Sequence, residues 1–182
     1  LGYELYVDFK DTKKIYELII NKGKDFNLSN CGMHAMDIMR MESGFLHWGH
    51  DISPEENQYQ AGLNFTISFK KEIEFIGKKA VEKIKTQKLD RRFAMFTLKS
   101  NKPGEPLLLH EEPIYLDDEI IGKTTSGNYS FNFNKNITFG YIKTDFSNSE
   151  LLNKNLFVEI EKHKYPISIQ TEPLKRTDFK NL

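Results

Sequence analysis

The 182-residue chain contains a single cysteine, Cys31. One thiol cannot form an intrachain disulfide and cannot build a cysteine-rich metal site, so both are excluded. A chain that does without disulfides suits a reducing compartment. We therefore expect a cytoplasmic protein.

Long apolar runs and an excess of charge are missing as well. No run reaches the roughly eighteen apolar residues that a membrane-spanning helix needs, and 26 basic residues balance 26 acidic ones. No block of like charge is long enough for a nucleic-acid-binding or acidic tail. The sequence also lacks a Gly-x-Gly-x-x-Gly fingerprint, a phosphate-binding loop and a Gly-x-Ser-x-Gly elbow. We therefore expect neither a membrane nor a nucleic acid as partner.

The first half of the chain mixes helical and alternating patterns. Apolar residues at helical spacing predict helices over residues 12–21, 29–42 and about 75–85. Alternation predicts strands over Leu1 to Phe9 and Asn64 to Phe69. Because the first strand starts without an initiator methionine or a leader, we expect the chain to be a piece of a longer protein. The upstream part of the same polypeptide, or self-association, would then complete the unpaired strand.

From residue 91 onward the pattern is alternating throughout. Six short strands without an intervening helix predict a small barrel or a sandwich. They cover residues 93–98, 114–116, 119–124, 137–142, 157–161 and 166–170. The change falls in a charged stretch, so we predict an incomplete α+β domain over residues 1–85 and an all-β barrel domain over residues 86–182.

The run from Cys31 to Leu63 concentrates the polar and aromatic candidates and has the character of a ligand-pocket wall. Arg40 lies in an otherwise apolar helix, where a guanidinium needs a carboxylate or a stacking partner. That partner is either a ligand or an intramolecular acid, Asp37 or Glu42. Trp48 follows the helix on a loop, where a flat ring can stack on a flat ligand. Phe65 is a second aromatic wall candidate, with the alternative that it is a core residue.

His47, His50 and Asp51 raise the possibility of a metal site, since three ligand types occur within five residues. No fourth ligand at a recognisable spacing accompanies them. We therefore predict no metal, and expect Asp51 to fix the turn instead.

Several ordered blocks resemble the folate-binding glycine cleavage T-protein family. In the first half these are Gly2-Tyr3-Glu4-Leu5, the helical block from Asp37 to Gly44, Tyr59-Gln60-Ala61-Gly62-Leu63 and Phe75-Ile76-Gly77. In the second half they are the block from Gly122 to Ser130, Val158-Glu159-Ile160 and Tyr165-Pro166. The Trp48-Gly49-His50-Asp51 turn is similar to the form found at the C-terminal end of dimethylglycine and sarcosine dehydrogenases.

The resemblance implies tetrahydrofolate as the ligand and assigns the pterin to Glu4, beside Tyr3. A carboxylate can accept from adjacent ring N–H and amino donors in a bidentate pair. It also places Arg40 and Trp48 around the folate, where Phe65 is the further wall candidate, and it implies no metal.

The resemblance assigns the catalytic aspartate and the FAD domain to segments upstream of this chain, so no catalytic residue is expected here. The parent would be an FAD-dependent dimethylglycine or sarcosine dehydrogenase-like enzyme that captures the oxidised methyl carbon as methylene-tetrahydrofolate. The alternatives are a fragment of a stand-alone aminomethyltransferase and a non-catalytic folate-binding or interaction module. In a eukaryote, the resemblance implies the mitochondrial matrix.

Overall fold

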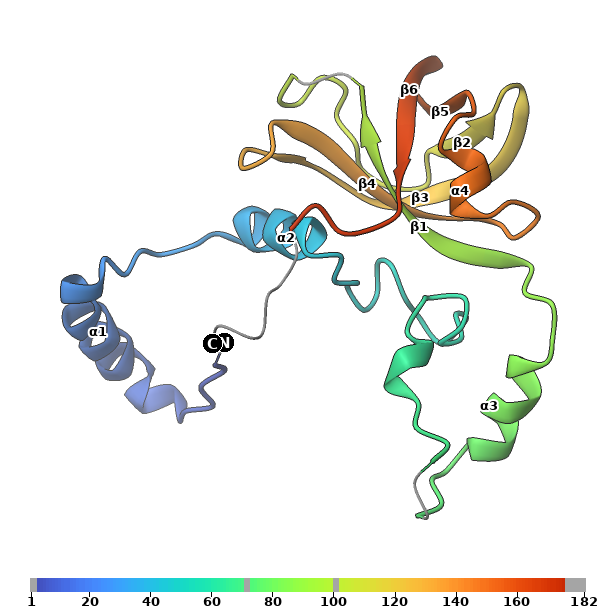
Figure 1. Cartoon of the computed structure of the whole chain (residues 1–182). Helices are drawn as coiled ribbons and strands as arrows, with labels where there is room; N and C mark the ends of the chain where they lie inside the picture. Colours follow the sequence, from blue (N-terminus) through green and yellow to red (C-terminus); the bar gives the residue numbers. More distant parts are fainter. Residues whose placement is uncertain (1–2, 71–72, 100–101, 176–182) are drawn as a thin grey trace. The chain divides into compact units, whose positions relative to one another are not determined.

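A computed structural model describes residues 3–70, 73–99 and 102–175 of the chain. Within these residues the chain forms two compact units, one covering residues 3–36 and the other residues 37–175. Figure 1 shows the elements along the chain, and each unit is described by itself below.

The first unit is built from local helical turns. The 3₁₀ turn η1 (Phe9–Asp11) leads into helix α1 (Thr12–Gly23), which is followed by the 3₁₀ turn η2 (Lys24–Phe26). The prediction of a helix over residues 12–21 is confirmed. The predicted strand over Leu1 to Phe9 is wrong: residues 3–8 have no regular structure, and Leu1 and Gly2 lie outside the described residues. A strand forms only against a hydrogen-bonded neighbour, and no strand of the described residues pairs with this segment.

Helix α2 (Met33–Glu42) begins later than predicted but ends where expected. Gly44 has a left-handed φ of 74°. The Gly44 N–H donates to the Met41 carbonyl at 3.0 Å, and the Phe45 N–H donates to the Arg40 carbonyl at 2.8 Å. This pair of bonds is a Schellman motif, which satisfies carbonyls at the helix end and turns the chain sharply.

Two short elements lie between α2 and the strands. The 3₁₀ turn η3 (Asn64–Thr66) replaces the strand predicted over Asn64 to Phe69, so that prediction is wrong. The Thr66 hydroxyl donates to the Leu63 carbonyl at 2.7 Å, a local bond that competes with extended structure. Helix α3 (Lys78–Lys85) starts after Gly77, which confirms the third predicted helix.

The second half of the chain is a closed six-stranded antiparallel barrel, as Figure 1 shows. Its strands follow in the order β1-β4-β3-β2-β5-β6, with β1 and β6 closing the cylinder. Their bounds are β1 (Arg91–Leu98), β2 (Pro113–Leu116), β3 (Glu119–Ser130), β4 (Lys135–Lys143), β5 (Leu156–Ile160) and β6 (His163–Gln170). All six predicted strands are confirmed, and the barrel is the correct choice over the sandwich.

The interior of the barrel is apolar and close-packed. Phe96, Ile114 and Val158 are fully buried in its main core cluster. Gly140 permits close approach of β3, because an added Cβ would lie 2.4 Å from the Lys123 carbonyl oxygen. Helix α4 (Asn148–Leu151), which was not predicted, starts with a capping box between Ser147 and Glu150.

The end of α2 is fixed to the barrel by a second apolar cluster. Ile38 and Met41 pack with Met95, Ile137 and Phe139. These contacts hold the last turn of α2 against the strands, and they set the position of the polar side chains that α2 carries between its apolar ones.

Candidate functional site

Arg40 is the centre of a polar cluster between α2 and β3. Its Nε–H donates to Asp37 Oδ1 at 2.9 Å, and Nη2 lies 2.7 Å from the same oxygen. Nη2 also donates to Ser126 Oγ at 2.8 Å, while Nη1 donates to the Phe45 carbonyl at 3.2 Å and to Asp51. A guanidinium has five N–H donors, so these partners engage all of them. The predicted intramolecular pair with Asp37 is confirmed.

Asp51 is the buried anion of this cluster, with a fully buried side chain. Its Oδ1 accepts from Thr125 Oγ1 at 2.5 Å and from Ser126 Oγ at 2.8 Å. Its Oδ2 accepts from the His47 backbone N–H at 2.9 Å and from Arg40. The prediction that Asp51 fixes the turn is therefore confirmed. The turn residues are tied both to α2 and to the barrel.

Glu42 makes a second buried contact between α2 and β3, rather than pairing with Arg40. Its carboxylate accepts from Ser130 Oγ at 2.6 Å and from Asn132 Nδ2 at 2.9 Å. Sequence reasoning did not single out Ser126 or Ser130. The signal was present, since hydroxyl residues recur along a strand that should otherwise face an apolar core.

Trp48 lies on the turn that Asp51 fixes, and its side chain is 63% exposed. The turn is closed by a hydrogen bond from the Gly49 N–H to the Ile52 carbonyl at 2.8 Å. An exposed indole on a fixed turn is available for stacking. Arg40 and Trp48 thus belong to one local arrangement.

Phe65 lines an apolar cavity of about 610 Å³ in the second unit. The cavity walls are mainly apolar, from the loop after α2, the Ala61-Gly62-Leu63 exit and the start of β1. They include Phe45, Leu46, Ile52, Leu63, Phe93 and Met95. Phe65 itself is 79% exposed, which favours its prediction as a wall residue over that as a core residue.

Tyr3 and Glu4 belong to the first unit, so the structure does not place them against the other three predicted residues. Tyr3 is exposed. The Glu4 carboxylate accepts a hydrogen bond from the Tyr6 hydroxyl at 2.6 Å. Both side chains are accessible within their unit, and their role stays a prediction.

The three metal-ligand types near the turn are not assembled into a site. The His47 and His50 rings lie 4.7 Å apart, but both Asp51 oxygens bind protein donors. Among residues 3–70, 73–99 and 102–175, no group of three His, Cys, Asp or Glu side chains could hold a metal ion. Nor is any helix of the described part long and apolar enough to cross a bilayer.

Two family models match the chain. Residues 1–71 match the GCVT N-terminal domain, and residues 91–175 match the glycine cleavage T-protein C-terminal barrel domain. The second match coincides with the strands of the barrel.

Individual relatives agree with this. The chain is 33% identical over 178 residues to the mitochondrial dimethylglycine dehydrogenase of Rattus norvegicus, covering 98% of the chain and 20% of that protein. It is 34% identical over 145 residues to an aminomethyltransferase of Halothermothrix orenii, covering 80% of the chain and 39% of that protein. The chain thus spans about a fifth of the dehydrogenase and two fifths of the transferase.

A solved structure has the same fold. The glycine cleavage system aminomethyltransferase T from Bartonella henselae superposes with a TM-score of 0.75 at 20% identity, over 90% of this chain and 44% of that one. With the ordered sequence blocks and the closed barrel, these matches show that the chain belongs to the glycine cleavage T-protein family.

Proposed function

We propose that the chain is the tetrahydrofolate-binding C-terminal region of an FAD-dependent dimethylglycine or sarcosine dehydrogenase-like enzyme. The observation that carries this choice is the alignment with dimethylglycine dehydrogenase over 98% of the chain. The protein would act in the cytoplasm, or in the mitochondrial matrix of a eukaryote. In domain terms, residues 1–85 would be part of the folate-binding domain and residues 86–182 the barrel domain.

In this proposal the apolar cavity beside Phe65 receives a flat ring of the folate. Its volume of about 610 Å³ falls within the usual range of small-molecule pockets, roughly 300–1,000 Å³. Trp48 supplies a stacking surface, and Glu4, beside Tyr3, accepts from the pterin donors. Arg40 serves mainly by holding the Trp48 turn, because a direct bond to the ligand would replace one of its internal bonds.

Bound tetrahydrofolate would supply the nitrogen that takes up the one-carbon unit. This chain would bind and orient that cofactor. The catalytic aspartate and the FAD site would lie in the upstream part of the polypeptide, so the chain alone would not catalyse the full reaction.

The upstream part would also cover apolar side chains of the first unit. Large apolar residues there are exposed, and such surface on one unit marks a contact site. They include Tyr3, Leu5, Tyr6, Phe9 and Phe26. These exposed side chains, and not an unpaired strand, are the reason to expect an upstream partner or self-association.

A stand-alone aminomethyltransferase is the second candidate, favoured by the match to the Halothermothrix orenii enzyme and by the Bartonella henselae structure. A non-catalytic folate-binding or interaction module is the third. An upstream sequence with a Gly-x-Gly-x-x-Gly fingerprint would select the dehydrogenase. A catalytic aspartate without that fingerprint would select the transferase. An upstream sequence with neither feature would select the non-catalytic module.

The binding test uses 5-formyltetrahydrofolate as a stable probe. Trp48 is the only tryptophan, so its fluorescence reports on the turn directly. We expect saturable quenching of the Trp48 fluorescence in the 182-residue chain. Calorimetry on the chain extended by its upstream sequence should confirm the binding. Glu4→Ala should weaken binding by about 1–3 kcal/mol, because charge-assisted partners are left unmade.

Phe65→Ala should also weaken binding, whereas Phe131→Ala, which truncates an exposed ring outside the cavity, should not. Unchanged affinity in Glu4→Ala would remove that residue from the site. Absence of binding by the extended chain would overturn the proposed function.

A further inference from the structure

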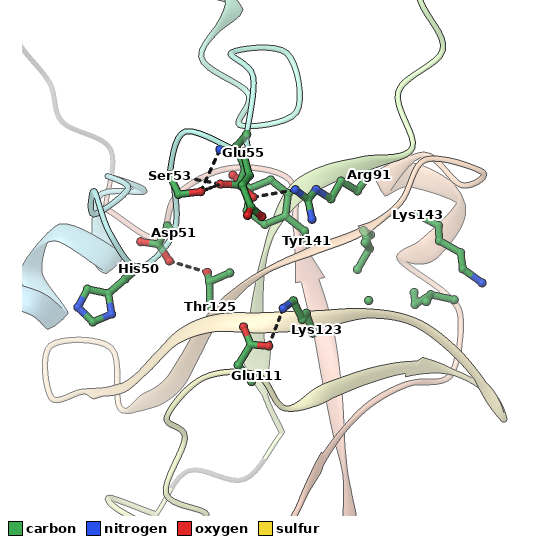
Figure 2. Close-up of a pocket in the computed structure, with 14 residues that line it drawn as sticks. His50, Asp51, Ser53, Glu55, Arg91, Glu111, Lys123, Thr125, Tyr141 and Lys143 are labelled. Atoms are coloured by element: carbon green, nitrogen blue, oxygen red, sulfur yellow. Dashed lines mark hydrogen bonds and ion pairs between the residues drawn. The ribbon is translucent and has the colours of Figure 1, made fainter.

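A second cavity, of about 320 Å³, lies between the segment after the Trp48 turn and strands β3 and β4, as Figure 2 shows. Its lining residues are mainly polar and differ from those of the apolar cavity beside Phe65. They come from residues 50–56, from the start of β1, from Glu111 before β2, and from the facing parts of β3 and β4. The floor is apolar where Ile121, Gly122 and Ile142 contribute.

Tyr141 places an unused hydrogen-bond donor in this cavity. The residue is only 5% exposed, and its hydroxyl has no hydrogen-bond partner within the described residues. Burial, together with the charges of Glu56 and Asp51, raises the pKa of Tyr141 well above its ordinary value. The phenol therefore stays protonated at physiological pH, and a buried O–H without an acceptor is costly.

Arg91 provides a second unused donor beside it. Its Nη2 donates to Glu56 Oε1 at 2.9 Å, whereas its buried Nε–H finds no partner within the described residues. The Arg91 Cζ lies 5.6 Å from the centroid of the Tyr141 ring. Glu56 is itself held by the Ser53 hydroxyl at 2.7 Å, so the guanidinium is fixed in position. Two buried donors on neighbouring groups thus lack acceptors.

The charged groups around the cavity are largely paired, so the two unused donors, and not an excess of positive charge, select the ligand. Lys123 pairs with the lining acid Glu111, as Figure 2 shows, and Lys143 pairs with Glu119. Two further lining acids are engaged, since Asp51 pairs with Arg40 and Glu56 pairs with Arg91. Glu55, by contrast, is an exposed acid on the lining and would repel an anion weakly.

We propose that this cavity binds a small aliphatic monocarboxylate, whose oxygens accept from the Tyr141 hydroxyl and the Arg91 Nε–H. A carboxylate presents two acceptor atoms, which matches two neighbouring donors, and charge-assisted bonds are the strong ones. The short alkyl part would lie on the floor formed by Ile121, Gly122 and Ile142. The residues that line this cavity differ from those that line the cavity beside Phe65, and Asp51 is the lining residue that also holds the Trp48 turn.

The test is a titration of the ¹⁵N-labelled 182-residue chain with sodium propionate at constant ionic strength. We expect saturable shifts of the backbone amides of Gly122, Lys123 and Tyr141. Propionamide and propylammonium, of the same size but without the negative charge, should not saturate over the same range. Saturation by propylammonium instead of propionate would overturn the proposal.

Two substitutions that should change the propionate affinity in opposite directions make the test sharper. Tyr141→Phe removes only the hydroxyl and should weaken propionate binding about tenfold. Glu55→Gln removes an exposed repelling charge and should strengthen binding about twofold. Tyr115→Phe makes the same chemical change at a tyrosine outside the cavity and should leave the affinity unchanged.

Unchanged affinity in Tyr141→Phe would show that the hydroxyl does not hold the ligand, and would overturn the proposal. The absence of saturable shifts with propionate would do the same, and would mean that water satisfies the two donors. Because Glu55 is exposed, Glu55→Gln should leave the fold intact. It therefore tests the negative charge expected of the ligand even if Tyr141→Phe unfolds the chain.

Discussion

The barrel and the first unit use their large apolar residues in opposite ways. In the barrel, Phe96, Ile114 and Phe139 are fully buried, and every strand is paired on both sides. In the first unit, α1 buries none of its residues, and Phe9 and Phe26 are 97% and 84% exposed. The barrel therefore contains the contacts that stabilise it, whereas the described residues of the first unit have local hydrogen bonds and none of them is buried.

This difference shows that a helix can form from local interactions alone, whereas a sheet needs tertiary contacts. A helix satisfies its backbone hydrogen bonds within itself, so α1 can form without burying a side chain. A sheet depends on its neighbours, and the barrel meets that need by closure. We therefore expect the free energy of unfolding to come mainly from residues 91–170 and from the side chains that join α2 to them.

The largest expected effect comes from truncating the barrel core. Phe96→Ala should lower the free energy of unfolding by about 4 kcal/mol, because it removes a fully buried ring and leaves a cavity. Phe26→Ala should change it by less than about 0.5 kcal/mol, since that ring is exposed. Urea denaturation followed by circular dichroism measures both. Equal losses would contradict the contrast between the two regions.

Breaking the buried charge cluster should have the next largest effect. Asp51→Asn should cost about 3 kcal/mol, because it removes the fully buried anion of the mostly buried Arg40 and leaves it only the partly exposed Asp37. The matched control is Asp145→Asn, which breaks an exposed pair with Lys88 and should cost less than about 1 kcal/mol. Chemical denaturation of both variants tests this. A small loss for Asp51→Asn would mean that the apolar cluster alone fixes α2.

The smallest expected effect concerns the attachment of the Ala61-Gly62-Leu63 exit to the barrel. The Gln60 side chain donates to Asp90 at 2.7 Å, and this bond lowers the pKa of the Asp90 carboxyl. A carboxyl with a lowered pKa in the folded state stabilises the fold above its unfolded pKa of about 3.9, and loses that effect as the pH falls through its folded value.

Gln60→Met should therefore raise the Asp90 pKa toward its ordinary value and make stability less dependent on acidic pH. An NMR titration of the Asp90 carboxyl carbon measures the shift. Gln170→Met, which removes a side-chain bond to Thr97, should leave the Asp90 pKa unchanged. An unchanged pKa in Gln60→Met would show that the bond does not hold the carboxyl.

The sequence predicted the barrel well and the irregular segments poorly. Antiparallel strands that follow one another leave strong alternation in the sequence. The Asp117-Asp118 turn joins two of them, β2 and β3. The strands expected at Leu1 to Phe9 and Asn64 to Phe69 failed because alternation alone cannot provide a partner strand. Helix α4 was not predicted, because its capping box is followed by only one helical turn.

For the candidate site, sequence reasoning found the charged residues but not their hydroxyl partners. The pair of Arg40 with Asp37 follows from helical spacing, and a carboxylate in a turn predicts the role of Asp51. Ser126 follows Asp51 by 75 residues, so only the packing of the turn against β3 brings the two together. The roles of the expected folate-binding residues remain proposals. They rest on the family resemblance and, for Trp48 and Phe65, on the exposure of their side chains.

The pairing of β1 with β6 has a further consequence for engineering. Because Met95 lies opposite Gln170, the chain enters and leaves the barrel along the same seam. A short linker could join Gln170 to Arg91, with new termini opened at the Asp117-Asp118 turn, and the six strand ladders would keep their registers. The barrel is thus suited to circular permutation, and as an insert it could be carried within the loop of another protein.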